Sequence, residues 1–469
     1  MSSAKRRKAA AGSFLGIGLA VTLLAAPAGP EPGTAKHLEA AVRIVREALV
    51  AREGYGLLRE LCGLGPRLSG SAGMEQAIGW ARGRMEKLGL DRVWLQPVTV
   101  KAWERGGPAE AVLVDRAGAE AGRLSVAALG NSVGTPGAGI SGEVLEVGSI
   151  EELRRRGAEA RSKIVFFNAP LDGGVRLTDE SYDRVVVNRM SGPDAAAEVG
   201  AAAVLIRSLT TAGDDQPRTG VLKYLSKAAP IPGAALSPRA ADALAAALER
   251  EPRSRVRLRL PCRPLPDRAS CNLIGEIRGR EKPEEVIVVA GHLDSWDLGP
   301  GAHDDGGGCL QALEVLSLLK RLGLAPKRTV RCVLYADEEN GSFGARAYAA
   351  FASGSGETHL AVMESDRGVF EPRGFSLTGS EAVLAKVRAW QPLLAPAGID
   401  WVRPGDGGTA DVSYITNARA ILGLLNDSQT YMDLHHSALD VFEAVNPRAM
   451  ELGAAAMAIL AHVVSEEGL

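Results

Sequence analysis

The stretch that decides the fold class of this chain runs from residue 286 to residue 308 and reads VIVVAGHLDSWDLGPGAHDDGGG. Its first part, Val286 to Ala290, is a continuous apolar run, which predicts a strand covered on both faces. The run ends in His292 and Asp294, and a helical pattern from Cys309 to Leu322 follows the glycine-rich loop. A strand, a polar loop and a helix in this order predict a doubly wound α/β sheet.

Two more apolar runs further along the chain also end in acidic residues. The strand expected at Thr329–Tyr335 leads to Glu338 and Glu339, and the strand expected at Leu360–Met363 leads to Asp366. In open α/β sheets, ligands bind at the carboxyl ends of the strands. These polar residues are therefore expected to share one site.

The sequence pattern differs in the region between the expected N-terminal helices and the strands described above. Short valine-rich strands alternate with long polar loops, and a proline-rich segment, 261–266, closes the region like a linker. We expect one domain that is split into residues 37–122 and 267–469 around an inserted α/β domain of residues 123–266.

The N-terminus has the pattern of an export signal. Lys5 to Lys8 form a basic segment, Phe14 to Ala25 a short apolar run, and Ala26 and Ala28 an A-x-A cleavage pattern. The alternative is an uncleaved anchor, but a membrane-spanning helix needs roughly 20 apolar residues. We therefore predict a signal peptide over residues 1–28, an exported protein, and no stable membrane span after cleavage.

Composition excludes some partners. The 469 residues carry a formal charge of −2, with no basic surplus that would favour nucleic-acid binding. The five cysteines include no C-x-x-C pair, so a thiolate metal site is not expected. Cys262 and Cys271 are close enough in sequence to form a disulfide in an exported protein, but the sequence leaves that question open.

The polar residues after the first strand suit a metal site. A metal-bound histidine needs an acceptor for its other ring nitrogen, which Asp294 could supply to His292. Asp304 and Asp305 are adjacent carboxylates, and two like charges at close range call for a cation. A helix follows directly, so Asp305 could cap it while Asp304 binds the metal.

The remaining candidates are two adjacent pairs. One of Glu338 and Glu339 could bind metal while the other faces an attacking water as a general base. One of His435 and His436 would complete the site. Imidazole and carboxylate ligands without thiolates suit zinc, and five ligands suit two ions that share an aspartate.

Several segments together resemble a known family. They are Gly291-His292-Leu293-Asp294-Ser295-Trp296-Asp297, Asp304-Asp305-Gly306-Gly307-Gly308, Glu338-Glu339 with Gly341, and Glu364-Ser365-Asp366. This set is similar to the co-catalytic zinc aminopeptidase and glutamate carboxypeptidase superfamily. Residues 65–71 and 103–106 also resemble its carboxypeptidase Q subgroup. The likeness covers nearly the whole chain after the signal.

The resemblance implies a zinc-exopeptidase fold with a protease-associated-like inserted domain, and two zinc ions (Zn2+) per chain. His292 and Asp366 would hold one ion, Glu339 and His436 the other, and Asp304 would bridge them. The preference for His436 over His435 rests on the family's habit of a ligand histidine directly before serine or threonine.

The resemblance also implies the catalytic groups. Glu338 would act as the general base toward a bridging hydroxide, and Asp294 would orient His292. The peptide bond between Asp304 and Asp305 is expected to be cis. His303 could make an extra polar contact or have no role, and Asp411 is a candidate contact for a substrate amino group.

The expected activity is metal-dependent hydrolysis of dipeptides or short peptides. Neither the motifs nor the resemblance decides between the amino and the carboxyl end of the substrate. The alternatives are a zinc amidohydrolase acting on acylated small molecules and a non-catalytic binding protein on the same fold. The resemblance also suggests a homodimer.

Overall fold

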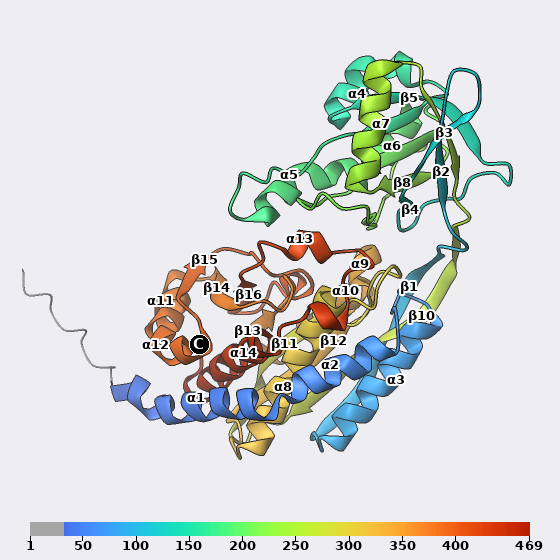
Figure 1. The fold of residues 1–469 in the computed structure, drawn as a ribbon. Coiled ribbons are helices and arrows are strands. Elements are labelled where there is room, and N and C mark those ends of the chain that lie inside the picture. Colours follow the sequence, from blue (N-terminus) through green and yellow to red (C-terminus); the bar gives the residue numbers. More distant parts are fainter. Residues whose placement is uncertain (1–31) are drawn as a thin grey trace, which may run out of the picture.

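The computed structural model describes residues 32–469, so the expected signal peptide lies outside the described residues. Figure 1 shows two lobes, each built on its own sheet, and two long strands that run from one lobe to the other. The first lobe contains both ends of the described chain. The second lobe lies between the two long strands in sequence.

The first lobe is built on an eight-stranded mixed sheet. The neighbours β12, β11, β13 and β16 are mutually parallel. β10 runs antiparallel to both β1 and β12, and β14 runs antiparallel to β16 but parallel to β15. In spatial order the strands are β1 (Arg92–Glu104), β10 (Arg263–Ile277), β12 (Arg328–Tyr335), β11 (Lys282–His292), β13 (Thr358–Glu364), β16 (Ala420–Asn426), β14 (Pro372–Gly379) and β15 (Trp401–Pro404).

Both faces of this sheet are covered. Along β11, Ile287 and Val289 pack into the core on one face, while Val286, Val288 and Ala290 pack into the core on the other. Successive side chains of a strand point to opposite faces, so a strand buried on both sides is apolar throughout. The predicted doubly wound α/β sheet is confirmed.

The helices of the first lobe cover those two faces. The larger core is formed with α1, α2, α3, α8 and α14, and the smaller one with α10. The bounds are α1 (Pro32–Ala51), α2 (Glu53–Gly63), α3 (Ala72–Lys87), α8 (Gly307–Arg321), α9 (Glu338–Gly341), α10 (Phe343–Gly354), α11 (Glu381–Ala389), α12 (Gln391–Leu394), α13 (Tyr431–Leu434) and α14 (Pro447–Glu467).

The C-terminal helix α14 has the length and composition of a helix that could cross a membrane, with a mean hydropathy of 1.3 over its most apolar window. It is mostly buried and packs against α1 and α8 in the core of the first lobe. Its apolar character is therefore that of a core helix.

The second lobe has its own eight-stranded sheet, flanked by α4 (Ile150–Arg156), α5 (Thr178–Met190), α6 (Gly192–Glu198) and α7 (Pro238–Arg250). In spatial order its strands are β3 (Glu120–Leu124), β2 (Glu110–Val114), β9 (Arg255–Arg259), β5 (Ile140–Val147), β6 (Ile164–Phe167), β7 (Ala203–Arg207), β8 (Gly233–Leu236) and β4 (Val126–Ala128).

Two features of the second lobe's boundaries differ from expectation. The boundary expected at residue 123 falls inside β3, because β2 and β3 form a hairpin that pairs with β9 and so belongs to the second sheet. The proline-rich segment that we read as a linker enters β10, where Pro264 lies opposite Trp103. This part of β10 pairs on one side only, and proline is tolerated on an unpaired strand edge.

All five cysteines lie in the described part of the chain, and all are free thiols. Cys262 donates a hydrogen bond to the carbonyl oxygen of Ser132, and Cys271 lies opposite Pro97 in β10. The disulfide between Cys262 and Cys271 that the sequence left open is therefore not formed in this structure.

Candidate metal centre

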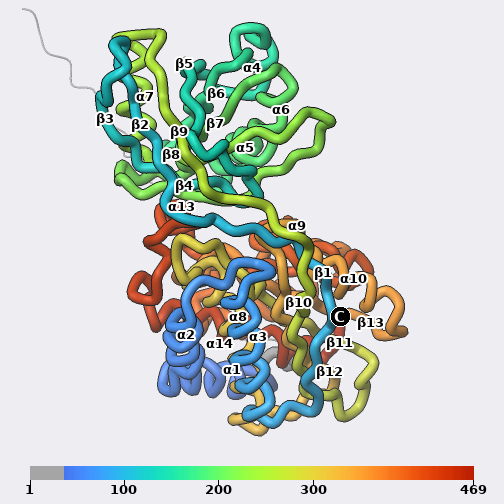
Figure 2. Tube along the Cα trace, turned by 90° about the vertical axis from the view of Figure 1, so that its right-hand side faces the viewer, coloured from blue at the N-terminus to red at the C-terminus, as the bar shows by residue number. Residues whose placement is uncertain are grey.

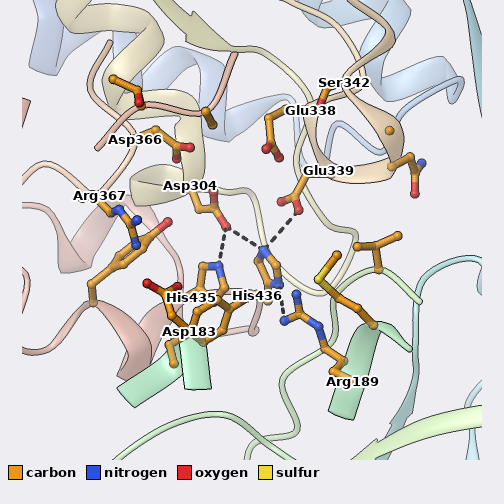
Figure 3. A pocket seen from close by; sticks show the side chains of 18 of the residues that line it. Asp183, Arg189, Asp304, Glu338, Glu339, Ser342, Asp366, Arg367, His435 and His436 are labelled. Atoms are coloured by element: carbon orange, nitrogen blue, oxygen red, sulfur yellow. Dashed lines mark hydrogen bonds and ion pairs between the residues drawn. The ribbon is translucent and has the colours of Figure 1, made fainter. Parts of the chain in front are cut away.

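The parallel strands of the first sheet deliver the predicted residues to one edge. β11 ends at His292, Asp366 lies two residues beyond the end of β13, and the short helix α9 after β12 carries Glu338 and Glu339. Because these three strands are parallel neighbours, their carboxyl ends meet. Figure 3 shows Glu338, Glu339, Asp366 and Asp304 around one pocket, with His435 and His436 below them.

Asp304 lies at the centre of this cluster and faces two groups of side chains. Its Oδ1 is 3.4 Å from Nε2 of His292, which is itself 3.7 Å from Oδ1 of Asp366. Its Oδ2 is 3.1 Å from Nε2 of His436, which is 3.1 Å from Oε2 of Glu339. The two carboxylate oxygens thus point to two separate sets of potential ligands.

The backbone around Asp304 is held in an unusual conformation. The peptide bond between Asp304 and Asp305 is cis, as the resemblance implied. The carboxylate of Asp440 accepts hydrogen bonds from the backbone N–H groups of His303 (2.7 Å) and Asp304 (3.0 Å). Asp440 therefore fixes the position of the backbone at Asp304.

Asp305 points away from the cluster and caps the following helix. Its carboxylate accepts hydrogen bonds from the backbone N–H groups of His292 (3.0 Å) and Gly308 (3.2 Å). A Cβ atom on Gly308 would overlap the carboxylate of Asp305 and the carbonyl oxygen of Ser365. The glycines after the two aspartates thus allow strand, loop and helix to approach closely.

Asp294 contacts His292 and also supports the glutamate pair. Nδ1 of His292 is 3.0 Å from the backbone carbonyl of Asp294 and 3.6 Å from its Oδ1. The carboxylate of Asp294 accepts the backbone N–H groups of Glu338 (3.1 Å) and Glu339 (3.3 Å). Asp294 thus helps to position both His292, at the end of β11, and the two glutamates that follow β12.

The two glutamates differ in their surroundings. Glu339 is buried and contacts His436, whereas Glu338 is half-buried and lines the pocket without a contact to either histidine of the doublet. Burial and the neighbouring carboxylates raise the pKa of Glu338 well above its usual value. A carboxylate with a raised pKa is a better proton acceptor, as general-base catalysis requires.

The two histidines of the doublet differ in their distances to the acidic residues. Nε2 of His436 is within 3.1 Å of both Asp304 and Glu339, whereas Nε2 of His435 lies 3.6 Å from Asp304 and stacks on the His436 ring at 3.5 Å between centroids. Burial opposes a charge on His436, but Glu339 and Asp304 outweigh it and raise its pKa to about 9. Both contacts favour His436 as the residue that shares a cation with Glu339.

The buried acidic groups fit a cation site. Oδ2 of Asp304 and Oε1 of Glu339 are buried and make no hydrogen bond within the described residues. Potential ligand atoms of His292, Asp304 and Asp366 lie within 4.8 Å of one another, and so do those of Asp304, His435 and His436. Carboxylates left buried and unpaired are unfavourable unless a cation neutralises them.

Two other candidates from the sequence have different roles. His303 is a structural residue, because Nδ1 accepts the backbone N–H of Val369 (3.1 Å) and its ring stacks on Phe370. The expectation that Asp411 contacts substrate is wrong for this structure. Its side chain is fully buried and the pocket is lined instead by its neighbours Thr409 and Ala410.

Arg67 is a site residue whose contacts could not be read from the sequence. Its buried guanidinium donates to the carbonyl oxygens of Leu293 (2.6 Å), Gly301 (3.0 Å) and Pro300. It therefore ties the beginning and the end of the loop between His292 and Asp304. The segment that resembles the carboxypeptidase Q subgroup contains Arg67, but the sequence gives no indication of these backbone acceptors.

The cluster opens into a pocket of about 290 Å³ between the lobes. The first lobe contributes the acidic residues together with Arg346, Arg367 and Tyr414, and the second lobe contributes Tyr182, Asp183, Arg189, Met190, Val221 and Lys223. Figure 1 places α13 and α5 on either side of the space between the lobes. Figure 2 shows the same two lobes from the side, joined by β1 and β10. The site is thus lined from both lobes.

Comparison with known proteins gives consistent results. Residues 272–461 match the model of peptidase family M28. Carboxypeptidase Q of Bos taurus is 38% identical over 403 residues, which are 86% of this chain and 83% of that protein. A peptidase M28 precursor from Shewanella amazonensis superposes with a TM-score of 0.88 and 31% identity, covering 92% of this chain and 97% of that one.

A more distant structure shares the fold alone. The zinc aminopeptidase BSAP of Bacillus subtilis has a TM-score of 0.63 at 19% identity, and the match covers 89% of this chain and 95% of that one. The sequence identity to carboxypeptidase Q and the M28 match carry the assignment. The chain belongs to peptidase family M28, as a metallopeptidase similar to carboxypeptidase Q.

Proposed function

We propose that this protein is a two-zinc exopeptidase that hydrolyses dipeptides or short peptides. The observation that carries the proposal is the position of Asp304, whose two carboxylate oxygens face two separate ligand sets. His292 and Asp366 would hold one ion, Glu339 and His436 the other, and Asp304 would contact both. Two zinc ions there would polarise the scissile carbonyl and lower the pKa of a water.

The protein's own groups would supply the proton transfers. Glu338 lines the pocket beside the metal-ligand set, and its backbone N–H is held by Asp294 at 3.1 Å. It would take a proton from the attacking water and deliver that proton to the leaving amine. Asp294 would keep both Glu338 and His292 in place throughout.

The size of the pocket favours a small substrate. Its volume of about 290 Å³ is at the lower end of the range for ligand pockets, roughly 300–1,000 Å³. The second lobe contributes Tyr182 and Arg189 to the wall facing the acidic cluster, so a long chain would have little room to pass through. A small pocket that is lined from both lobes favours cleavage near a chain end.

The charges around the pocket favour a free carboxylate on the substrate. Outside the acidic cluster, the pocket is lined by four basic residues and by a single further carboxylate, that of Asp183. The basic residues are Arg189, Lys223, Arg346 and Arg367. Arg189 is 5% exposed, and within the described part of the chain its Nε makes no hydrogen bond, while its Nη1 lies 3.5 Å from the carbonyl oxygen of Thr219 and 3.4 Å from Nδ1 of His436. A buried guanidinium is a strong partner for a carboxylate. We propose that it binds the C-terminal carboxylate of the peptide.

The test is hydrolysis of free, N-blocked and C-amidated dipeptides by the full mature chain with and without zinc. We expect zinc-dependent cleavage of free dipeptides, loss of cleavage on C-amidation, and a loss of roughly 10²- to 10⁴-fold with Glu338→Gln. Cleavage of acylated small molecules but of no dipeptide would favour the amidohydrolase. An unchanged rate with Glu338→Gln would refute the mechanism.

We also propose that the protein is exported. The basic segment, the apolar run and the A-x-A pattern at Ala26 and Ala28 support a signal that is removed after Ala28. N-terminal sequencing of protein recovered outside the cytoplasm should begin at Gly29. Recovery of the chain in the cytoplasm with its original N-terminus would contradict the proposal.

A further inference from the structure

The second lobe forms several hydrogen bonds to the segment that carries His435 and His436. A single loop of that lobe, residues 210–219, makes all of the following hydrogen bonds to residues 433–436. Thr210 Oγ1 (2.8 Å) and Thr211 Oγ1 (3.0 Å) donate to Oδ1 of Asp433, and Arg218 Nη2 donates to the carbonyl oxygen of Asp433 (2.6 Å). The backbone N–H of Thr219 donates to the carbonyl oxygen of His436 (3.0 Å).

The same loop also contacts the imidazole of His436. Nε2 of that ring faces Asp304 and Glu339, so Nε2 must be unprotonated to bind a cation and the ring proton then sits on Nδ1. Nδ1 lies 3.3 Å from the carbonyl oxygen of Thr219 and 3.4 Å from Nη1 of Arg189. A guanidinium has donors only, so the carbonyl oxygen is the group that can accept the Nδ1 proton. The acceptor that fixes the tautomer of His436 therefore comes from the second lobe.

Contacts within the second lobe also hold the loop in place. Arg218 is 3% exposed, and its guanidinium is held by both carboxylate oxygens of Asp214 (2.9 and 2.8 Å) and by the carbonyl of Gln216 (2.8 Å). Its backbone N–H donates to Oγ of Ser208 at 2.8 Å. A donor that is already fixed in this way loses little entropy when it contacts Asp433.

The ligands in the other half of the cluster are oriented by groups of the first lobe. Nδ1 of His292 is 3.0 Å from the carbonyl oxygen of Asp294, which belongs to the first lobe. Asp366 also comes from the first lobe, just beyond β13, and the contact with the second lobe on this side is made by its neighbour Arg367, which forms an ion pair with Asp179 (3.3 Å). The two ligand sets on either side of Asp304 therefore differ in their outer support.

We propose that the loop of residues 210–219 is a positioning element for the Glu339–His436 metal position, so that this position depends on the docked second lobe while the His292–Asp366 position does not. The inference rests on the proposed two-zinc function. Groups that support a metal ligand from outside typically change metal affinity 10- to 100-fold when they are removed.

The experiment is a zinc titration of the metal-free full chain against a competing chromophoric chelator. The wild type, Arg218→Gln, Thr210→Val and Glu339→Gln are compared, and Glu339→Gln identifies which binding step belongs to the Glu339–His436 position. Thr178→Val is the matched control, because it removes a different hydrogen bond between the lobes, from Thr178 Oγ1 to the carbonyl oxygen of Ser428 (3.3 Å).

We expect Arg218→Gln to weaken the step marked by Glu339→Gln by roughly 10- to 100-fold and to leave the other step unchanged. Thr210→Val should weaken the same step by less, and it carries the test if Arg218→Gln does not fold. Equal weakening of both steps, no weakening of either, or the same effect from Thr178→Val would overturn the inference. Fewer than two zinc ions bound to the wild type would instead refute the proposed function.

Discussion

Asp294 offers a direct test of how the centre is held together. Its carboxylate accepts two backbone N–H groups, those of Glu338 (3.1 Å) and Glu339 (3.3 Å), and it is fully buried. Asp294→Asn keeps the shape of the side chain, but its single carbonyl oxygen can serve one N–H well and its amide group would face the other. Loss of one hydrogen bond to a charged acceptor costs about 1.5–3 kcal/mol.

If that energy appears in the transition state, kcat/KM should fall by roughly 10- to 150-fold at saturating zinc. The control is Asp337→Asn, which changes the residue directly before Glu338. The asparagine introduced there still has an oxygen that can accept the hydrogen bond from Ser69 Oγ (2.5 Å). Both variants are assayed on a free dipeptide, and thermal unfolding confirms that each is folded. Full activity in Asp294→Asn, or an equal loss in Asp337→Asn, would refute the reasoning.

Three further predictions concern metal, pH and redox state. Chelation should abolish activity and zinc should restore it, and a rate that does not depend on metal would contradict this. The metal-bound form should also have a higher Tm, because a cation relieves the repulsion among the buried carboxylates. Burial raises the pKa of both Glu314 and Glu451. Between the unfolded-state pKa of about 4.3 and the raised folded-state pKa, the folded state therefore holds more protons than the unfolded state, and stability falls as the pH rises through that range. In Glu314→Gln the side-chain carbonyl can still accept the hydrogen bond from the N–H of Gly54. This variant should therefore raise the Tm more at pH 8 than at pH 5. An equal rise at both pH values would exclude the raised pKa of Glu314 as its cause. Because all five cysteines are free, a reductant should leave the Tm unchanged, whereas a fall would reveal a disulfide.

The central sheet and the ligand cluster could be predicted because their signals are local. The apolar run of β11 is continuous because both faces of the strand are buried, and His292 stands where that strand ends. Parallel strands then bring distant polar residues to one edge without further information. The extent of the second lobe could not be predicted in the same way, since β2 pairs with β9, which follows about 140 residues later. Nothing in residues 110–124 indicates that partner.

The outer support of the centre was harder to predict for a different reason. The sequence predicts that Asp294 supplies the acceptor for Nδ1 of His292, and in the structure its backbone carbonyl oxygen lies closer to Nδ1 than its carboxylate does, at 3.0 Å against 3.6 Å. For His436 the acceptor is again a backbone carbonyl, that of Thr219, from the other lobe. Every residue has a carbonyl group, so residue types carry no signal for this role. Metal ligands can be recognised by their chemistry, whereas the groups that orient them are determined by where the fold places the backbone.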